Sequence, residues 1–160
     1  MNPNVKKQVL RKMTYGMWVL AAGTGDDLEA SSVTWVTQVG FTPPLVAIAL
    51  KRDTRLAEVV KRHKAFTLHM LSKDQQELAS AFIKPTVVAD GKIGGIAYKP
   101  APVTGTPLLD GFACWFEARV TEIVEPGDHA LVIAEVVGVD ATDIAVQPFT
   151  LAQAGWSYGG

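Results

Sequence analysis

The sequence has little cysteine, little charge and no long apolar run. Cys114 is the one cysteine among 160 residues, so no internal disulfide and no thiolate metal cluster can form. Charged residues make up 19% of the chain and the net charge is −1 at pH 7. No overall field therefore attracts nucleic acid or an anionic membrane. Apolar runs such as Leu45 to Leu50 are far shorter than the roughly 20 residues that span a bilayer.

Familiar catalytic motifs are missing as well. The chain has no G-x-S-x-G nucleophile turn, no phosphate-binding Walker loop and no H-E-x-x-H zinc motif. Its histidines, His63, His69 and His129, lack the spacing of metal ligands, so we expect no metal site. Residues 1–11 are polar and basic, without the apolar core of a secretion signal. We therefore expect a protein of a reducing compartment, the cytoplasm.

The sequence does contain enough apolar residues to build a core. Hydrophobic residues make up 48% of the chain, and the mean hydropathy is +0.17. A chain of this length buries roughly 70% of its unfolded surface on folding. We predict a single domain over residues 1–160.

Apolar periodicity predicts about six or seven strands and three short helices. The strands follow one another as antiparallel hairpins without a regular strand–helix alternation, which favours a mainly β barrel over a doubly wound sheet. Residues 84–110 are rich in Gly, Pro and Lys, and we predict a long irregular loop there. The predicted helices begin at Asn2-Pro3, at Asp53 or Thr54, and at a capping box over Ser72–Gln75. The predicted strands span Met17–Ala22, Glu29–Gly40, Leu45–Leu50, Ala65–Leu71, Phe112–Val124 and His129–Val139.

Two features have simple structural interpretations. Val5, Val9 and Met13 recur four residues apart, which predicts a short apolar stripe on the first helix. Cys114 lies inside the predicted strand Phe112–Val124, so we interpret it as a small buried hydrophobic residue.

The predicted strand Glu29–Gly40 is unusual because its polar residues are hydroxyls and an amide instead of charges. Ser32, Thr34, Thr37 and Gln38 are the main examples. Such residues indicate a shielded, hydrogen-bonding face that suits a flat heteroaromatic ligand. The alternative is a barrel interior filled by small side chains, and Trp35 taken alone is typical of a core.

A second unusual segment is Lys51-Arg52-Asp53-Thr54-Arg55, where cations stand at the start of a predicted helix. Cations oppose the dipole at a helix N-terminus, and a bound phosphate would resolve that conflict by accepting the free N–H groups. The alternative is a set of solvated cations in which Thr54 only caps the helix. Together the two segments indicate a site for a mononucleotide with a flat base.

Several ordered motifs resemble one known family. They include Leu10-x-x-x-Thr14-Tyr-Gly16, Thr34-Trp-Val-Thr-Gln-Val39, Pro43-Pro-Leu-Val-Ala47, Gly127-Asp-His129 with Glu135-Val136 after it, and the final Tyr158-Gly-Gly160. In this order they resemble the flavin reductase-like family of FMN-binding split barrels, and in particular the subgroup of flavin reductase modules linked to rubredoxin-like proteins.

The resemblance implies a Greek-key split β-barrel that forms a homodimer, with FMN, or FAD, bound near the interface. It places the flavin ring along residues 32–38, the phosphate near the cationic turn, and Phe82 and the residues after it near the ring or the ribityl chain. The cofactor-binding residues expected on this basis are Ser31, Ser32, Val33, Thr34, Trp35, Thr37, Gln38, Lys51, Thr54, Arg55, Phe82 and Lys84.

The same resemblance implies a flavin reductase that takes a hydride from NADH or NADPH. His129 would be the catalytic residue, either positioning the nicotinamide or donating a proton to the reduced flavin. Electrons would pass to a small-molecule acceptor or to a redox partner protein. Two alternatives remain: an FMN-binding electron-transfer or partner-docking module without intrinsic NAD(P)H activity, and a barrel that binds another planar ligand.

Overall fold

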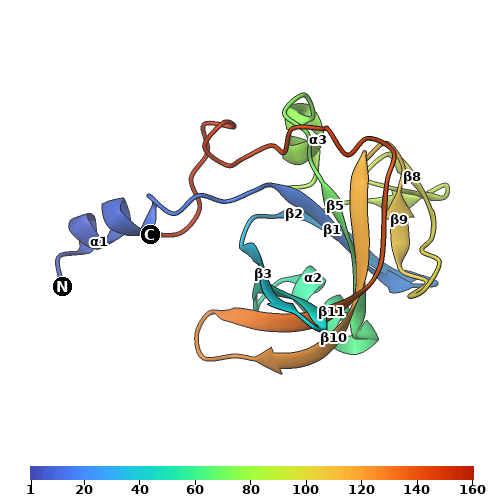
Figure 1. The fold of residues 1–160 in the computed structure, drawn as a ribbon, viewed down its shortest axis with the longest axis horizontal. Coiled ribbons are helices and arrows are strands. Elements are labelled where there is room, and N and C mark those ends of the chain that lie inside the picture. The colour runs from blue at the N-terminus through green and yellow to red at the C-terminus, as the bar shows by residue number, and fades with distance from the viewer.

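One open sheet of seven strands forms the body of the protein (Figure 1). The structure, a computed structural model, describes all of residues 1–160. The strands of this sheet are β1 (Trp18–Thr24), β2 (Asp27–Val33), β3 (Val36–Phe41), β4 (Pro44–Lys51), β5 (Ala65–Met70), β10 (Cys114–Val124) and β11 (His129–Ala141). Their order is β2-β1-β5-β10-β11-β4-β3, and every neighbouring pair is antiparallel. No ladder joins the edge strands β2 and β3, so the sheet is a split barrel, as predicted.

Strand β1 is buried on both faces and separates two apolar cores. Leu20 and Ala22 belong to one core, and the alternating residues Val19 and Ala21 belong to the other. Successive side chains of a strand point to opposite faces, so a strand covered on both sides is apolar at every position. This explains why the run at residues 17–22 shows no alternation.

The structure has three helices: α1 (Pro3–Leu10), α2 (Arg55–His63) and α3 (Gln76–Ala81). Helix α2 begins as predicted, because Thr54 accepts a hydrogen bond from Ala57 N–H at 3.3 Å. Of the predicted capping box before α3, one half forms: Gln75 accepts from Ser72 N–H at 3.0 Å. Helix α3 has no side-chain cap.

The prediction of an irregular loop over residues 84–110 is wrong. Four short strands form a second antiparallel sheet in the order β6-β7-β8-β9. Two-residue turns at Asp90-Gly91 and Gly94-Gly95, with positive φ at all four residues, connect its first three strands. The strands are β6 (Val88–Ala89), β7 (Lys92–Ile93), β8 (Ile96–Pro100) and β9 (Pro107–Leu109).

Two further expectations need correction. The single strand predicted over Glu29–Gly40 is in fact β2 and β3, interrupted at Thr34 and Trp35, where the chain passes from one edge of the sheet to the other. Cys114 is the first residue of β10 and is only partly buried, because it lies where the strand leaves the core, and its Sγ donates to the Asp143 carbonyl at 3.3 Å.

Helix α1 projects from the barrel beside the C-terminus (Figure 1). Asn2 caps it as predicted, by accepting from Asn4 N–H and Val5 N–H. The apolar stripe is present but not buried, since Val5, Val9 and Met13 are each more than half exposed. None of the three helices is long and apolar enough to cross a membrane.

Two buried polar side chains connect the sheets. Glu117 on β10 accepts from the N–H groups of Val103 and Thr104, at 3.1 and 2.7 Å, and so fixes the turn before β9. The buried His69 on β5 bonds to β1 on one side and to β9 on the other. These bonds hold the small sheet against the barrel.

Candidate functional site

Side chains from five separate segments line one cleft of about 550 Å³. The segments are the start of β1, the end of β2 with its link to β3, the end of β4 with the start of α2, the residue after Phe82, and the C-terminal tail. The lining residues are Met17, Ser31, Ser32, Val33, Thr34, Trp35, Ala49, Leu50, Lys51, Thr54, Leu56, Ile83, Leu151, Trp156, Ser157 and Tyr158.

The hydroxyl residues Ser31 and Ser32 of β2 line this cleft, as predicted. Ser31 donates to the Phe82 carbonyl at 3.0 Å, and Ser32 donates to the Ala79 carbonyl at 2.8 Å. These bonds hold the edge of β2 against α3 and fix both hydroxyl oxygens. Each oxygen keeps lone pairs that can accept hydrogen bonds from a ligand.

The start of α2 forms the positive end of the cleft. Lys51 lines it and forms an ion pair with Asp53 at 3.1 Å. Thr54 caps the helix, and the N–H groups of Arg55 and Leu56 donate to no group of the protein. Free N–H groups at a helix start and a neighbouring ammonium form a site that suits an anion.

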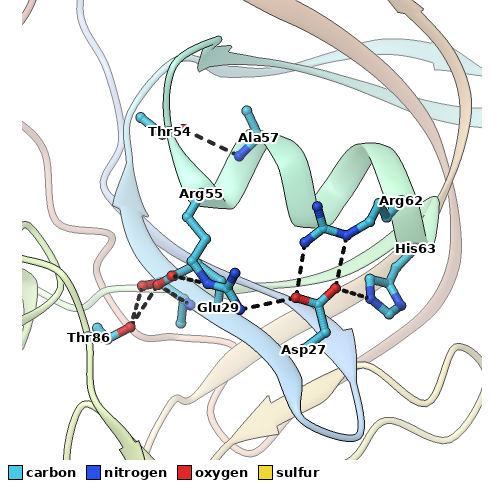
Figure 2. Close-up of polar contacts among 9 residues, drawn as sticks. Asp27, Glu29, Thr54, Arg55, Ala57, Arg62, His63 and Thr86 are labelled. Carbon is cyan, nitrogen blue, oxygen red and sulfur yellow. Dashed lines mark hydrogen bonds and ion pairs between the residues drawn. The ribbon is translucent and has the colours of Figure 1, made fainter.

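Arg55 takes no part in the lining of the cleft. Figure 2 shows its guanidinium directed to β2, where it pairs with Asp27 at 3.1 Å and with Glu29 at 3.4 Å. Asp27 also accepts from Arg62 and His63, and these hydrogen bonds lower its pKa to about 2. These ion pairs connect α2 to β2 and hold the guanidinium of Arg55, though not its backbone N–H, away from the anion site.

Phe82 and Lys84 also lie outside the cleft. The Phe82 side chain is fully buried in the core on the far face of β1, and only its carbonyl reaches β2. Lys84 is exposed and does not line the cleft. Ile83, between them, is the residue of this segment that lines the cleft.

His129 lies behind the cleft wall. Its Nδ1 is 2.8 Å from Asp128 Oδ1 and its Nε2 is 2.8 Å from the Tyr158 hydroxyl. Its ring packs on Trp35, with centroids 4.7 Å apart. The hydrogen bond from His129 lowers the pKa of Asp128, and burial raises the pKa of Tyr158.

A second, apolar groove of about 560 Å³ lies on the other side of Trp35 and Tyr158, which line both cavities. Thr37 lines this groove instead of the cleft. Gln38 is exposed and donates to the Gly40 carbonyl at 3.2 Å. The residues predicted to form one ligand-binding face therefore fall into two groups: those before Trp35 line the cleft, and Thr37 after it lines the groove. The remaining lining residues of the groove are Leu10, Met13, Thr14, Tyr15, Val36, Ala47, Ala49, Leu131 and Gly160.

Four of the cleft residues that sequence reasoning missed come from the C-terminal tail. Leu151, Trp156, Ser157 and Tyr158 all line the cleft. In the sequence, the aromatic residues of this tail stand among small residues. This contrast is the one feature of the sequence that could have indicated a role for the tail in the site.

Comparison with known proteins shows the family. Residues 10–155 match the family described as flavin reductase like domain, so the chain belongs to this family, as its motifs indicated. An NADH:FMN oxidoreductase of Rhodococcus qingshengii is 27% identical over 137 residues, which cover 86% of this chain and 70% of that protein.

Solved structures agree with the fold. The styrene monooxygenase flavin reductase of Pseudomonas putida S12 has a TM-score of 0.76 and 27% identity, covering 98% of this chain and 97% of that one. The NADH:FAD oxidoreductase SgcE6 of Streptomyces globisporus, in complex with NAD and FAD fragments, has a TM-score of 0.81. It is 21% identical, with 100% of this chain and 95% of that chain covered.

The residues of the cleft fit a flavin mononucleotide. Its volume of about 550 Å³ lies within the roughly 300–1,000 Å³ of small-molecule sites. Most lining residues are apolar, as the planes of the ring require, and Lys51 with the free N–H groups of α2 suits the phosphate. Trp35 on the cleft wall also carries a buried Nε1 without a hydrogen-bond partner.

Proposed function

We propose that the protein is a flavin reductase that uses NADH or NADPH to reduce FMN bound in the cleft. The observation that carries this proposal is the convergence of hydroxyls and a cationic helix start on one cleft, in a chain of the flavin reductase family. FAD contains the same flavin and the same first phosphate, so it would use the same residues. The electrons would then pass to a small-molecule acceptor or a redox partner protein.

The chain's own residues bind and orient, while a bound flavin supplies the hydride acceptor. Lys51 and the free N–H groups of Arg55 and Leu56 would hold the phosphate. Ser31 and Ser32, fixed by their bonds to backbone carbonyls, would accept hydrogen bonds from the polar edge of the ring.

A comparison of FMN with riboflavin tests the anion site. Lys51→Gln is expected to weaken FMN binding by roughly fivefold, about 1 kcal/mol for a half-exposed charged hydrogen bond, and to leave riboflavin binding unchanged. Lys99→Gln on β8 is the matched control, because Lys99 is exposed on the second sheet. Equal loss of FMN and riboflavin in Lys51→Gln would argue against a phosphate contact.

The reduction of bound FMN by NADH or NADPH needs a separate measurement. Under anaerobic conditions, bound FMN that is bleached by NADH or NADPH supports the reductase. FMN that stays bound and coloured would support an electron-transfer module, and a protein that binds no flavin would end the proposal.

We further propose a homodimer in the cytoplasm. Val9 on α1 and Met13 just after this helix are 62% and 59% exposed, and Phe41 on β3 is 88% exposed. The apolar groove lies between these elements. A second copy would cover this surface by a two-fold contact. Sedimentation equilibrium at micromolar concentration checks it: a dimer is expected, and a monomer would contradict it.

A further inference from the structure

A chain of hydrogen bonds connects the β10–β11 turn to the C-terminal tail. Asp128 Oδ1, His129 and the Tyr158 hydroxyl follow one another at 2.8 Å and 2.8 Å. His129 is held from the other side by Trp35, which also contacts the Tyr158 ring edge-on, with centroids 5.1 Å apart. Tyr158 lines the cleft and His129 does not.

The tail is fitted closely to Trp35. A Cβ on Gly159, which has a φ of +79°, would lie 2.7 Å from the Trp35 ring. The Gly159 carbonyl accepts from Arg11 Nε at 3.0 Å. The Tyr158 side chain is therefore held at one place, as the wall between the cleft and the groove.

The partners determine where the protons lie. The Asp128 carboxylate can only accept, so Nδ1 of His129 carries a hydrogen and donates to it. In the neutral imidazole Nε2 is then an acceptor, and the Tyr158 hydroxyl must donate to it. Both lone pairs of the Tyr158 oxygen remain for a ligand in the cleft. When His129 is protonated, Nε2–H donates to the Tyr158 oxygen instead, and the hydroxyl hydrogen is displaced toward the cleft.

We propose that Tyr158 is a ligand-contacting residue of the cleft, and that His129 and Asp128 act through it as positioning residues. With a neutral His129, Tyr158 offers an acceptor to an N–H or O–H group of the ligand. This inference rests on the proposed function, because the ligand in question is the flavin or the nicotinamide substrate. In this proposal His129 acts on the ligand through Tyr158, whereas the family resemblance implied a direct catalytic role.

Riboflavin is the probe, because it has N–H and O–H donors and no phosphate that titrates. Tyr158→Phe should weaken riboflavin binding by roughly two- to tenfold, the worth of one hydrogen bond. His129→Ala should weaken it to a similar extent, and the double variant no further, because one contact is lost in each case. His129→Gln, whose amide oxygen can accept from the tyrosine, should restore binding. Tyr98→Phe on β8 is the matched control and should bind like the wild type.

A measurement without ligand tests whether His129 holds Tyr158 in place against Trp35. We measure acrylamide quenching of Trp35 as the difference between each protein and its Trp35→Phe counterpart. Quenching should increase in Tyr158→Phe, which loses the hydrogen bond to His129, and increase further in His129→Ala, which also loses the ring packed on Trp35. It should return toward the wild-type value in His129→Gln. A wild type that binds neither riboflavin nor FMN would overturn the proposed function together with this inference. Normal riboflavin binding by Tyr158→Phe, in a wild type that binds flavin, would overturn this inference alone.

Discussion

Acidification should weaken the fold through one buried histidine, His69. The ring is fully buried, its Nδ1–H donates to the Val19 carbonyl at 3.0 Å, and its Nε2 accepts from Leu109 N–H at 2.9 Å. A proton added at Nε2 would face the Leu109 N–H and lose that bond. Burial lowers the pKa of His69 to about 4, from an ordinary value of 6.5.

The sign and the size come from the difference between the folded and unfolded pKa values. The unfolded chain takes up the proton near pH 6.5 and the folded chain only near pH 4, so the contribution of His69 is complete above pH 6.5 and is lost as the pH falls toward 4. One pKa unit corresponds to roughly 1.4 kcal/mol. The free energy of unfolding should therefore fall by roughly 1.4 kcal/mol at pH 5.5 and by roughly 3 kcal/mol at pH 4.

Urea denaturation of the wild type and of His69→Gln, at several pH values from about 8 to about 4.5, measures this effect. Glutamine can donate and accept but does not titrate, so the variant should be less stable at pH 8 and should lack this part of the pH dependence. The difference between the two proteins removes the contribution of the carboxylates. Parallel curves, or an NMR titration of His69 near pH 6.5 in the folded protein, would refute the reasoning.

Three further changes test other parts of the structure. Gly138→Ala should lower stability by roughly 1–3 kcal/mol in thermal or urea unfolding, because its Cβ would lie 2.6 Å from Oε1 of the buried Glu117; an unchanged midpoint would contradict this. Thr54→Ala should lower stability by roughly 1 kcal/mol through loss of the α2 cap, whereas Thr54→Ser should not. Asp27→Asn should lack the loss of stability that the wild type shows as the pH falls from 3.8 to about 2, because the pKa of Asp27 is lowered to about 2; acid unfolding curves that coincide would contradict it.

The main sheet could be predicted from the sequence because its strands are long and covered by apolar residues. Residues 45–50 and 65–71 form β4 and β5 within one or two residues of the expected bounds. The second sheet was missed because β6 and β7 have only two residues each, too few for any periodicity. Asp90-Gly91 and Gly94-Gly95 are strong hairpin signals, and the composition of the segment obscured them.

The sequence predicted the site residues that lie close together on one strand, and it did not predict the residues that distant segments bring to the cleft. Ser31 and Ser32 are neighbours on β2 and both line the cleft, as the resemblance implied, whereas strict alternation along a strand would place only one of them there. Arg55 does not line the cleft, because Asp27 and Glu29, which are distant in sequence, attract its guanidinium. The place of Tyr158 depends on the path of a tail without regular structure, and no periodicity predicts such a path.

Anaerobic addition of NADH to the protein with one equivalent of FMN tests the central claim most directly. We predict that the visible absorbance of the flavin shifts on binding, and is then bleached at a rate that saturates with NADH and far exceeds the rate with FMN alone. A flavin spectrum that the protein does not change, or bleaching no faster than in buffer, would contradict the account.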